Sequence, residues 1–275
     1  MAVNREKVLE SAQKFAEKKK YDKAIAELRR IVDVEPNDVR ALHKMGEYQI
    51  KMGQLAEALD TYEAVGRLYE QGGFAPKAIA VYRQMREMFP HVPQASARYV
   101  HIAPKLAQLH REAGHTREAQ ALYIEIAQQM QHAGRDAEAI EAMRVLAELD
   151  PENALGHLGL AEAQARVRDM QGAVESYKKA AQLLMAAQRG NDAIQVFERL
   201  LAQHADLEAA RTCGELYLAR GRGQPDGMAA LAKLQICARA TPNDPQLLAL
   251  VARAFDLIGD RHKAEEVRRH LQSAR

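Results

Sequence analysis

Pairs of small residues twelve positions apart recur along the whole chain of 275 residues, and they constrain the fold more than any other feature. Small side chains let two helices approach closely, so this spacing predicts antiparallel helices joined by a short turn. The pairs are Ala12/Ala24, Gly46/Ala58, Gly66/Ala78, Ala107/Ala119, Ala127/Ala139, Ala161/Ala173, Ala181/Ala193 and Ala252/Ala264. A ninth pair, Gly214/Ala230, is sixteen residues apart and contains the insert GRGQPDG.

The second residue of each pair, called the anchor below, opens a stripe of larger side chains. Spacings of four and then three residues place such a stripe on one face of a helix. The residues four positions after the anchors are Leu28, Tyr62, Tyr82, Tyr123, Met143, Tyr177, Phe197, Leu234 and Arg268. The five aromatic residues in this set are predicted to lie in the core. Prolines that follow four anchors by twelve residues (Pro36, Pro90, Pro151 and Pro242) predict helix boundaries.

This pattern resembles the tetratricopeptide repeat, in which a small residue on a first helix precedes an alanine on a second. In the second copy the motif is Leu42, Met45, Gly46 and Gln49, followed by Ala58, Tyr62 and Val65. The first copy contains Val8, Ser11, Ala12 and Phe15, and the last contains Leu248, Val251, Ala252 and Phe255. The tryptophan that often opens the family's motif is absent, because the chain contains none. The resemblance implies an all-α solenoid of stacked helices over the whole chain.

The anchor intervals differ from the family's period of 34 residues: they are 34, 20, 41, 20, 34, 20, 37 and 34. An interval of 20 residues is long enough for one helix and a turn. We therefore expect an extra helix three times, about fifteen helices in total and an irregular superhelix. The predicted units are 4–36, 38–90, 94–151, 153–205, 206–242 and 243–275, of which the second, third and fourth contain three helices.

Charge and hydropathy narrow the class of protein. Lys and Arg number 39 against 37 Asp and Glu, which argues against a dedicated nucleic-acid-binding protein. The mean hydropathy is −0.40, and no stretch of about 18 apolar residues occurs, which argues against membrane insertion. The opening segment, MAVNREKVLESAQKFAEKKK, is too polar for a signal peptide and predicts a first helix. We expect a cytoplasmic protein.

No catalytic, metal or cofactor motif is recognisable. The chain has no phosphate-binding GxxxxGK[ST], no GxGxxG after a strand, no HExxH and no GxSxG. His110, Glu112 and His115 lie close in sequence, but residues five apart do not share a helix face, and Gly114 is expected to end that helix. Cys213 and Cys237 occupy equivalent positions on consecutive predicted helices, and we expect small buried side chains there. The sequence thus predicts no enzyme, no cofactor and no metal.

The family resemblance implies that first-helix side chains facing away from the second helices line a ligand groove. On this basis an acidic first unit (Glu6, Glu10, Gln13 and Glu17) precedes a basic middle, which suits an acidic peptide segment. A solvated charged face is the competing interpretation. The candidate partner-binding residues are Arg40, His43, Lys44, Glu47, Lys51, Tyr69, Lys105, Gln108, Arg111 and Arg166. Leu155, Leu158 and Glu162 project onto the same face, and Tyr217 is a further aromatic candidate.

Two segments are expected to be loops. The first is 90–105, where Pro104 predicts a kink or break near Ala103. The second is the insert 221–227, which contains Gly, Pro and Asp and predicts a turn.

Taken together, the sequence predicts a protein-interaction adaptor or assembly scaffold that binds a protein or peptide on a preorganised concave surface. The alternative is a regulatory sensor, whose solenoid binds a small peptide and changes curvature.

Overall fold

The computed structural model describes residues 4–92 and 96–273, and within them every regular element is a helix. Over these described residues, fifteen α-helices follow one another, as predicted, together with one short 3₁₀ helix. The chain forms two compact units, of which unit 1 covers residues 1–129 and unit 2 covers residues 130–275. Each unit is described by itself. The finer division into six repeat units stays a prediction.

Unit 1 contains the helices α1 to α6, the short 3₁₀ helix η1 and most of α7. They are α1 (Arg5–Glu17), α2 (Tyr21–Val32), α3 (Val39–Lys51), α4 (Leu55–Gln71), α5 (Ala75–Met88), the 3₁₀ helix η1 (Phe89–His91), α6 (Ser96–Glu112) and α7 (Thr116–His132). From α1 to α6, each helix packs against the next one in the chain.

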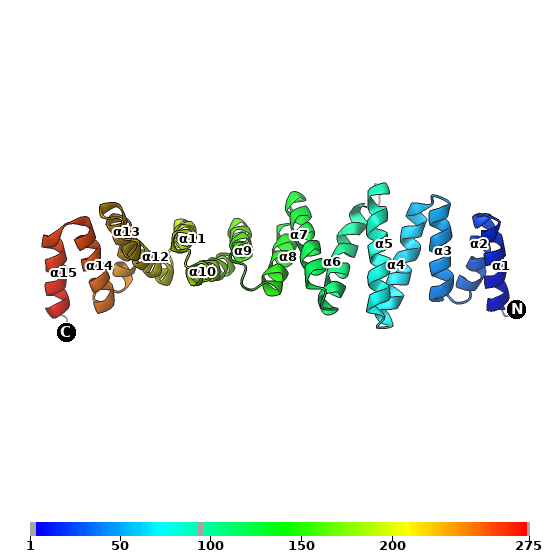
Figure 1. Cartoon of the computed structure of the whole chain (residues 1–275), viewed down its shortest axis with the longest axis horizontal. Coiled ribbons are helices and arrows are strands. Elements are labelled where there is room, and N and C mark those ends of the chain that lie inside the picture. The colour runs from blue at the N-terminus through cyan, green and yellow to red at the C-terminus, as the bar shows by residue number, and fades with distance from the viewer. Residues whose placement is uncertain (1–3, 93–95, 274–275) are drawn as a thin grey trace. The chain divides into compact units, whose positions relative to one another are not determined.

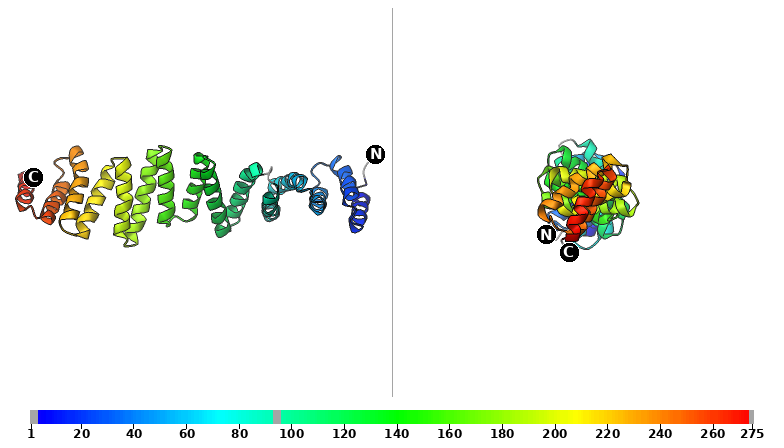
Figure 2. Two further views of the ribbon diagram at one scale, coloured as in Figure 1. Left: turned by 90° about the horizontal axis from the view of Figure 1, so that it is seen from above. Right: turned by 90° about the vertical axis from the view of Figure 1, so that its left-hand side faces the viewer.

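Unit 2 contains eight further helices, which again lie side by side in chain order (Figures 1 and 2). They are α8 (Asp136–Leu149), α9 (Ala154–Arg166), α10 (Met170–Ala186), α11 (Gly190–Gln203), α12 (Leu207–Arg220), α13 (Gln224–Ala240), α14 (Pro245–Ile258) and α15 (Arg261–Ser273).

The small residues allow close helix packing, as predicted, because a large side chain of the following helix packs against them. All nine anchor alanines are buried, and so are the five aromatic residues four positions after an anchor. A Cβ added to Gly46 would lie 3.0 Å from the Tyr62 ring, and one added to Gly66 would lie 2.4 Å from the Tyr82 ring. The backbone of the first helix therefore lies directly against an aromatic ring of the second.

The turns between paired helices share one backbone conformation. The residue five positions before the anchor has a positive φ in eight of the nine pairs: Lys19, Gly53, Gly73, Gly114, Gly134, Arg168, Gln188 and Gly259. The next residue donates its backbone N–H to the carbonyl five residues earlier, as Gln54 does to Gln49 at 2.9 Å and Arg189 to Leu184 at 2.8 Å. This is the Schellman motif, which satisfies carbonyls left free at a helix end. It explains why the small residues are twelve positions apart.

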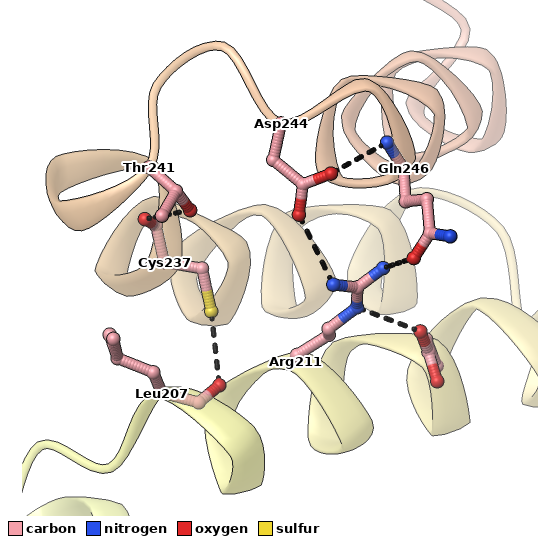
Figure 3. A network of polar contacts seen from close by, with 7 residues as sticks. Leu207, Arg211, Cys237, Thr241, Asp244 and Gln246 are labelled. Atoms are coloured by element: carbon pink, nitrogen blue, oxygen red, sulfur yellow. Dashed lines mark hydrogen bonds and ion pairs between the residues drawn. The ribbon is translucent and has the colours of Figure 1, made fainter.

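Aspartates that cap helices also tie together helices two places apart. Asp244 accepts a hydrogen bond from the Gln246 backbone N–H (2.9 Å) at the start of α14, and its other oxygen accepts from Arg211 of α12 at 3.2 Å (Figure 3). Asp206 at the start of α12 lies 3.0 Å from the Lys178 ammonium of α10. Arg5 of α1 pairs with Asp38, the cap of α3, in the same way. These contacts link alternate helices of a unit.

Both predicted loops are shorter than expected. Helix α6 continues through Pro104, so the predicted break near Ala103 is wrong, whereas the alternative of a kink there stays a prediction. Helix α6 begins at Ser96, and 93–95 lie outside the described residues. A proline costs a helix one hydrogen bond and some strain, and the buried neighbours Ile102, Ala103 and Leu106 favour the helix here. Helix α13 begins at Gln224, so the insert contributes only Gly221–Gly223 as a turn.

Asp226 explains the early start of α13. Its carboxylate is buried and accepts hydrogen bonds from Arg220 (2.9 and 2.5 Å) and from the backbone N–H of Arg222 (2.9 Å). The hydrogen bond from Arg220 lowers the pKa of Asp226 despite the opposing effect of burial. The two cysteines are free and buried, as predicted, and burial raises the pKa of Cys213 to about 12.

The shared turn conformation predicts which substitutions stabilise the protein. Gln188 has a φ of +59°, which strains a residue that has a Cβ. Gln188→Gly is expected to raise the free energy of unfolding by up to about 1 kcal/mol. Ala187→Gly is the control, because Ala187 has a φ of −79° and gains nothing from glycine. Urea unfolding followed by circular dichroism measures both. Equal destabilisation by the two glycines would contradict the prediction.

The close helix contacts predict opposite effects for two glycine-to-alanine substitutions. Gly66→Ala is expected to lower the free energy of unfolding by about 1–3 kcal/mol, because the new methyl group overlaps the Tyr82 ring. Gly159→Ala is expected to raise it by up to about 1 kcal/mol, because no heavy atom outside the helix backbone lies within 4 Å of a Cβ there. Thermal or urea unfolding distinguishes the two. A Gly66→Ala protein as stable as the wild type would refute the proposed contact.

Candidate partner-binding surface

Five of the predicted binding residues lie on α3, in unit 1. Arg40 and Lys51 are exposed, whereas His43, Lys44 and Glu47 are half-buried. The His43 ring meets the Tyr62 ring edge-on, with ring centres 5.6 Å apart, and its Nδ1 lies 3.2 Å from Glu47 Oε1. Tyr62 is fully buried, and burial raises its pKa to about 12. His43 is therefore held between a neutral phenol and a carboxylate.

Lys51 lies at the far end of α3, against an aromatic pair. The rings of Tyr21 and Tyr48 stack with centres 5.8 Å apart. The Lys51 ammonium lies 5.5 Å from the first ring centre and 5.6 Å from the second. Such cation–π contacts contribute about 0.5–1 kcal/mol at exposed sites. Lys51 is thus partly engaged by its own chain.

The other predicted residues of unit 1 lie on α4 and α6. Tyr69 contacts Phe74 edge-on with ring centres 6.3 Å apart, and the Lys77 ammonium lies 4.9 Å from the Phe74 ring centre. Phe74 is 52% exposed and is an aromatic surface residue that sequence reasoning missed. On α6, Lys105 is half-buried and Arg111 is exposed, whereas Gln108 donates a hydrogen bond to Glu112 at 2.8 Å.

Tyr217, the remaining aromatic candidate, is engaged within unit 2. Its hydroxyl donates to Glu198 at 2.8 Å, and the Arg220 guanidinium lies 4.9 Å from its ring centre. Lys233 binds the other oxygen of Glu198 at 2.5 Å. Burial and this carboxylate raise the pKa of Tyr217. Tyr217 thus links α12 to α11, and its hydroxyl group already has a hydrogen-bond partner within the chain.

Arg166 lies in a groove of unit 2, named here the α9–α11 groove, with a volume of about 650 Å³. Helix α9 forms one wall and α11 the other, and Tyr177 of α10 contributes to the lining between them. The lining residues are Gln131, Met143, Gly159, Glu162, Ala165, Arg166, Tyr177, Arg199, Ala202 and Gln203. Six of these ten residues are polar or charged, and Met143, Gly159, Ala165 and Ala202 supply the small and apolar part of the lining.

The polar groups of the groove differ in how far they are already satisfied. Arg199 forms an ion pair with Glu162 between the two walls. Arg166 is exposed and forms no ion pair with any residue that the structure describes. The Tyr177 hydroxyl accepts a hydrogen bond from Gln203 (3.3 Å), and burial raises its pKa, so the phenol keeps a proton that it can donate. A free guanidinium and a hydroxyl donor suit a carboxylate ligand.

The corresponding face of unit 1 shows why the groove opens in unit 2. Counted from the small residues Gly46 and Ala161, Lys44 corresponds to Gly159, Glu47 to Glu162 and Lys51 to Arg166. No side chain occupies the space beside Gly159, whereas α3 has a lysine there. The residues that sequence reasoning missed are those of the opposite wall, Arg199, Ala202 and Gln203. The shared register could have identified them, because they follow the anchor of α11.

Among residues 4–92 and 96–273, no group of three or more His, Cys, Asp or Glu side chains surrounds a position suitable for a metal ion. In that same part of the chain, no helix has the length and apolar character needed to cross a membrane.

Solved structures with similarity to the chain include helical-repeat proteins. They are MamA (18% identity over 58% of this chain and 92% of that chain, TM-score 0.32), MamA from Desulfovibrio magneticus RS-1 (18%, 56% and 94%, TM-score 0.31) and YrrB, described as a TPR protein with an unusual peptide-binding site (16%, 56% and 85%, TM-score 0.32). TM-scores of this size support no inference about function. No curated protein matches the chain significantly.

Two family models match consecutive parts of the chain. Residues 32–134 match the soluble NSF attachment protein family, and residues 132–183 match the tetratricopeptide repeat. The second match covers α8, α9 and most of α10, which carry the anchors Ala139 and Ala173. Over residues 132–183, the family match thus confirms the resemblance that the spacing of the small residues indicates.

Proposed function

We propose that this chain is a protein-interaction adaptor or assembly scaffold that binds a protein or peptide on its helical-repeat surface. The tetratricopeptide-repeat match supports this function, because stacked repeats hold many side chains in fixed relative positions before a partner arrives. A preorganised surface loses little conformational entropy on binding, so more of the interaction energy appears as affinity.

The α9–α11 groove is the observation that carries the proposal. Its volume of about 650 Å³ accommodates several side chains of a partner. Arg166 offers an unpaired positive charge, and Tyr177 and Gln203 offer hydrogen-bonding groups beside the small residues Ala165 and Ala202. We infer that the preferred partner presents an acidic segment here.

A second, separate candidate surface is formed by basic residues of unit 1. Arg40 and Lys44 of α3 and Arg111 of α6 are the residues whose charge suits an acidic partner. The proposed surface of unit 1 also includes His43, Glu47, Lys51, Tyr69, Lys105 and Gln108. The internal contacts of His43, Glu47 and Lys51 suggest that they position neighbours rather than supply free charge.

The remaining parts of the proposal concern chemistry and location. We propose a non-enzymatic protein, which the lack of a recognisable catalytic motif in the sequence supports. We propose a cytoplasmic location, which two free, buried cysteines suit, because reducing compartments keep thiols unpaired.

Two substitutions in the groove test the function, with a matched control. Gly159→Leu is expected to fill the groove without disturbing the fold, because the space beside that residue is empty. Arg166→Glu reverses the unpaired charge, and Arg239→Glu makes the same change at an exposed position of α13. Partners of the full wild-type chain are identified by affinity capture and mass spectrometry, and each affinity is then measured with purified proteins. Both groove variants are expected to weaken binding at least tenfold, about 1.4 kcal/mol, with Arg239→Glu unchanged.

Other outcomes locate the surface elsewhere or refute the function. If only the triple variant Arg40→Glu, Lys44→Glu and Arg111→Glu loses binding, the partner occupies unit 1 and the groove assignment is wrong. Binding that survives all of these changes contradicts both surfaces. Catalytic turnover of a bound molecule by the purified chain would overturn the adaptor function itself.

A further inference from the structure

The turn between α6 and α7 brings two imidazole rings together. His110 lies in the last turn of α6, and His115 is the residue before α7. The five-residue spacing does rule out a common helix face, because His115 lies beyond the helix. Nevertheless, the two Nδ1 atoms are 3.2 Å apart and the ring centres 5.4 Å apart.

The backbone dictates this contact. The His115 N–H donates to the His110 carbonyl at 2.8 Å, and Gly114 has a φ of +74°, so the pair occupies the two side-chain positions that a Schellman motif brings together. Other turns of this chain show the same juxtaposition. Tyr69 and Phe74 contact each other through their rings, and Gln164 donates a hydrogen bond to Asp169 at 3.4 Å. The proximity of the imidazoles is therefore a property of the turn.

The distance between the nitrogens matches that of two ligands of one metal ion. Zn²⁺ binds imidazole nitrogen at about 2.0–2.1 Å in tetrahedral geometry, which places two such nitrogens about 3.3–3.4 Å apart. The observed 3.2 Å is the distance of an N–H···N contact between the two rings, and a bound metal ion would replace the shared proton at nearly the same nitrogen separation. We propose that His110 and His115 form a two-imidazole chelate for a divalent transition-metal ion of the zinc or nickel class, for which imidazole is a suitable ligand.

The surroundings define what kind of site this is. Burial lowers the pKa of His110, as do His115 and Arg83 of α5, whereas Glu118 in the first turn of α7 raises it. His115 is exposed, and the described residues offer no third protein ligand, so water or a ligand from outside completes the coordination. The site is thus an open, exchangeable chelate and not a structural zinc site.

Calorimetric titration of the tag-free full chain with zinc chloride tests the proposal. Glutamine is the replacement of choice, because it occupies both equivalent positions in another turn of the chain, at Gln49 and Gln54. His110→Gln and His115→Gln are therefore expected to fold normally. Each is expected to weaken zinc binding at least tenfold, and the double variant no further, because one chelate needs both rings. His101→Gln, at an exposed position of the same helix, is expected to change nothing.

The melting temperature provides a second readout that does not depend on any partner protein. Zinc bound only to the folded chain raises its melting temperature, and this rise is expected to disappear in His110→Gln and His115→Gln. Undiminished zinc affinity in these variants, or an equal loss in His101→Gln, would overturn the chelate and indicate scattered surface binding. The adaptor function is unaffected by either result, because its tests use other residues.

Discussion

The packing of consecutive helices depends on a close contact between a small residue on one helix and a large side chain on the next. At Gly46 and Gly66 an aromatic ring lies directly against helix backbone. The longer turn between α12 and α13 also allows the contact, since Leu234 packs against Gly214, but in the other eight of the nine pairs a turn of one length joins the two helices. The Schellman motif supplies this length, and it satisfies the free carbonyls at the helix end. Packing and turn therefore depend on each other, and together they impose the twelve-residue spacing.

Much of the fold could be predicted from this spacing, whereas the binding surface could be predicted only in part. The anchors, the number of helices and the buried aromatic residues were predictable because each repeats the same local geometry. The continuation of α6 through Pro104 was not, because long-range packing outweighed a local preference. The start of α13 depended on the buried carboxylate of Asp226, whose partner Arg220 lies on another helix.

The candidate surface likewise has one part that the sequence predicts and another part that depends on packing between helices. Sequence reasoning identified Arg166 from its place on a first helix, but it gave no indication of the groove beside it. A groove is a property of several helices at once, and here it depends on the absence of a side chain at Gly159. Sequence patterns reveal charged residues easily, but they reveal empty space only when the equivalent positions of two repeats are compared.

The shared turn has a further consequence for how such a chain can acquire new chemistry. Three of the Schellman motifs hold two side chains of different kinds in contact: Gln164–Asp169, Tyr69–Phe74 and His110–His115. A hydrogen-bonded pair, an aromatic pair and an imidazole pair thus arise from one backbone geometry. These turns therefore act as two-residue sites of fixed spacing, in which the backbone geometry stays the same while the chemistry of the paired side chains differs.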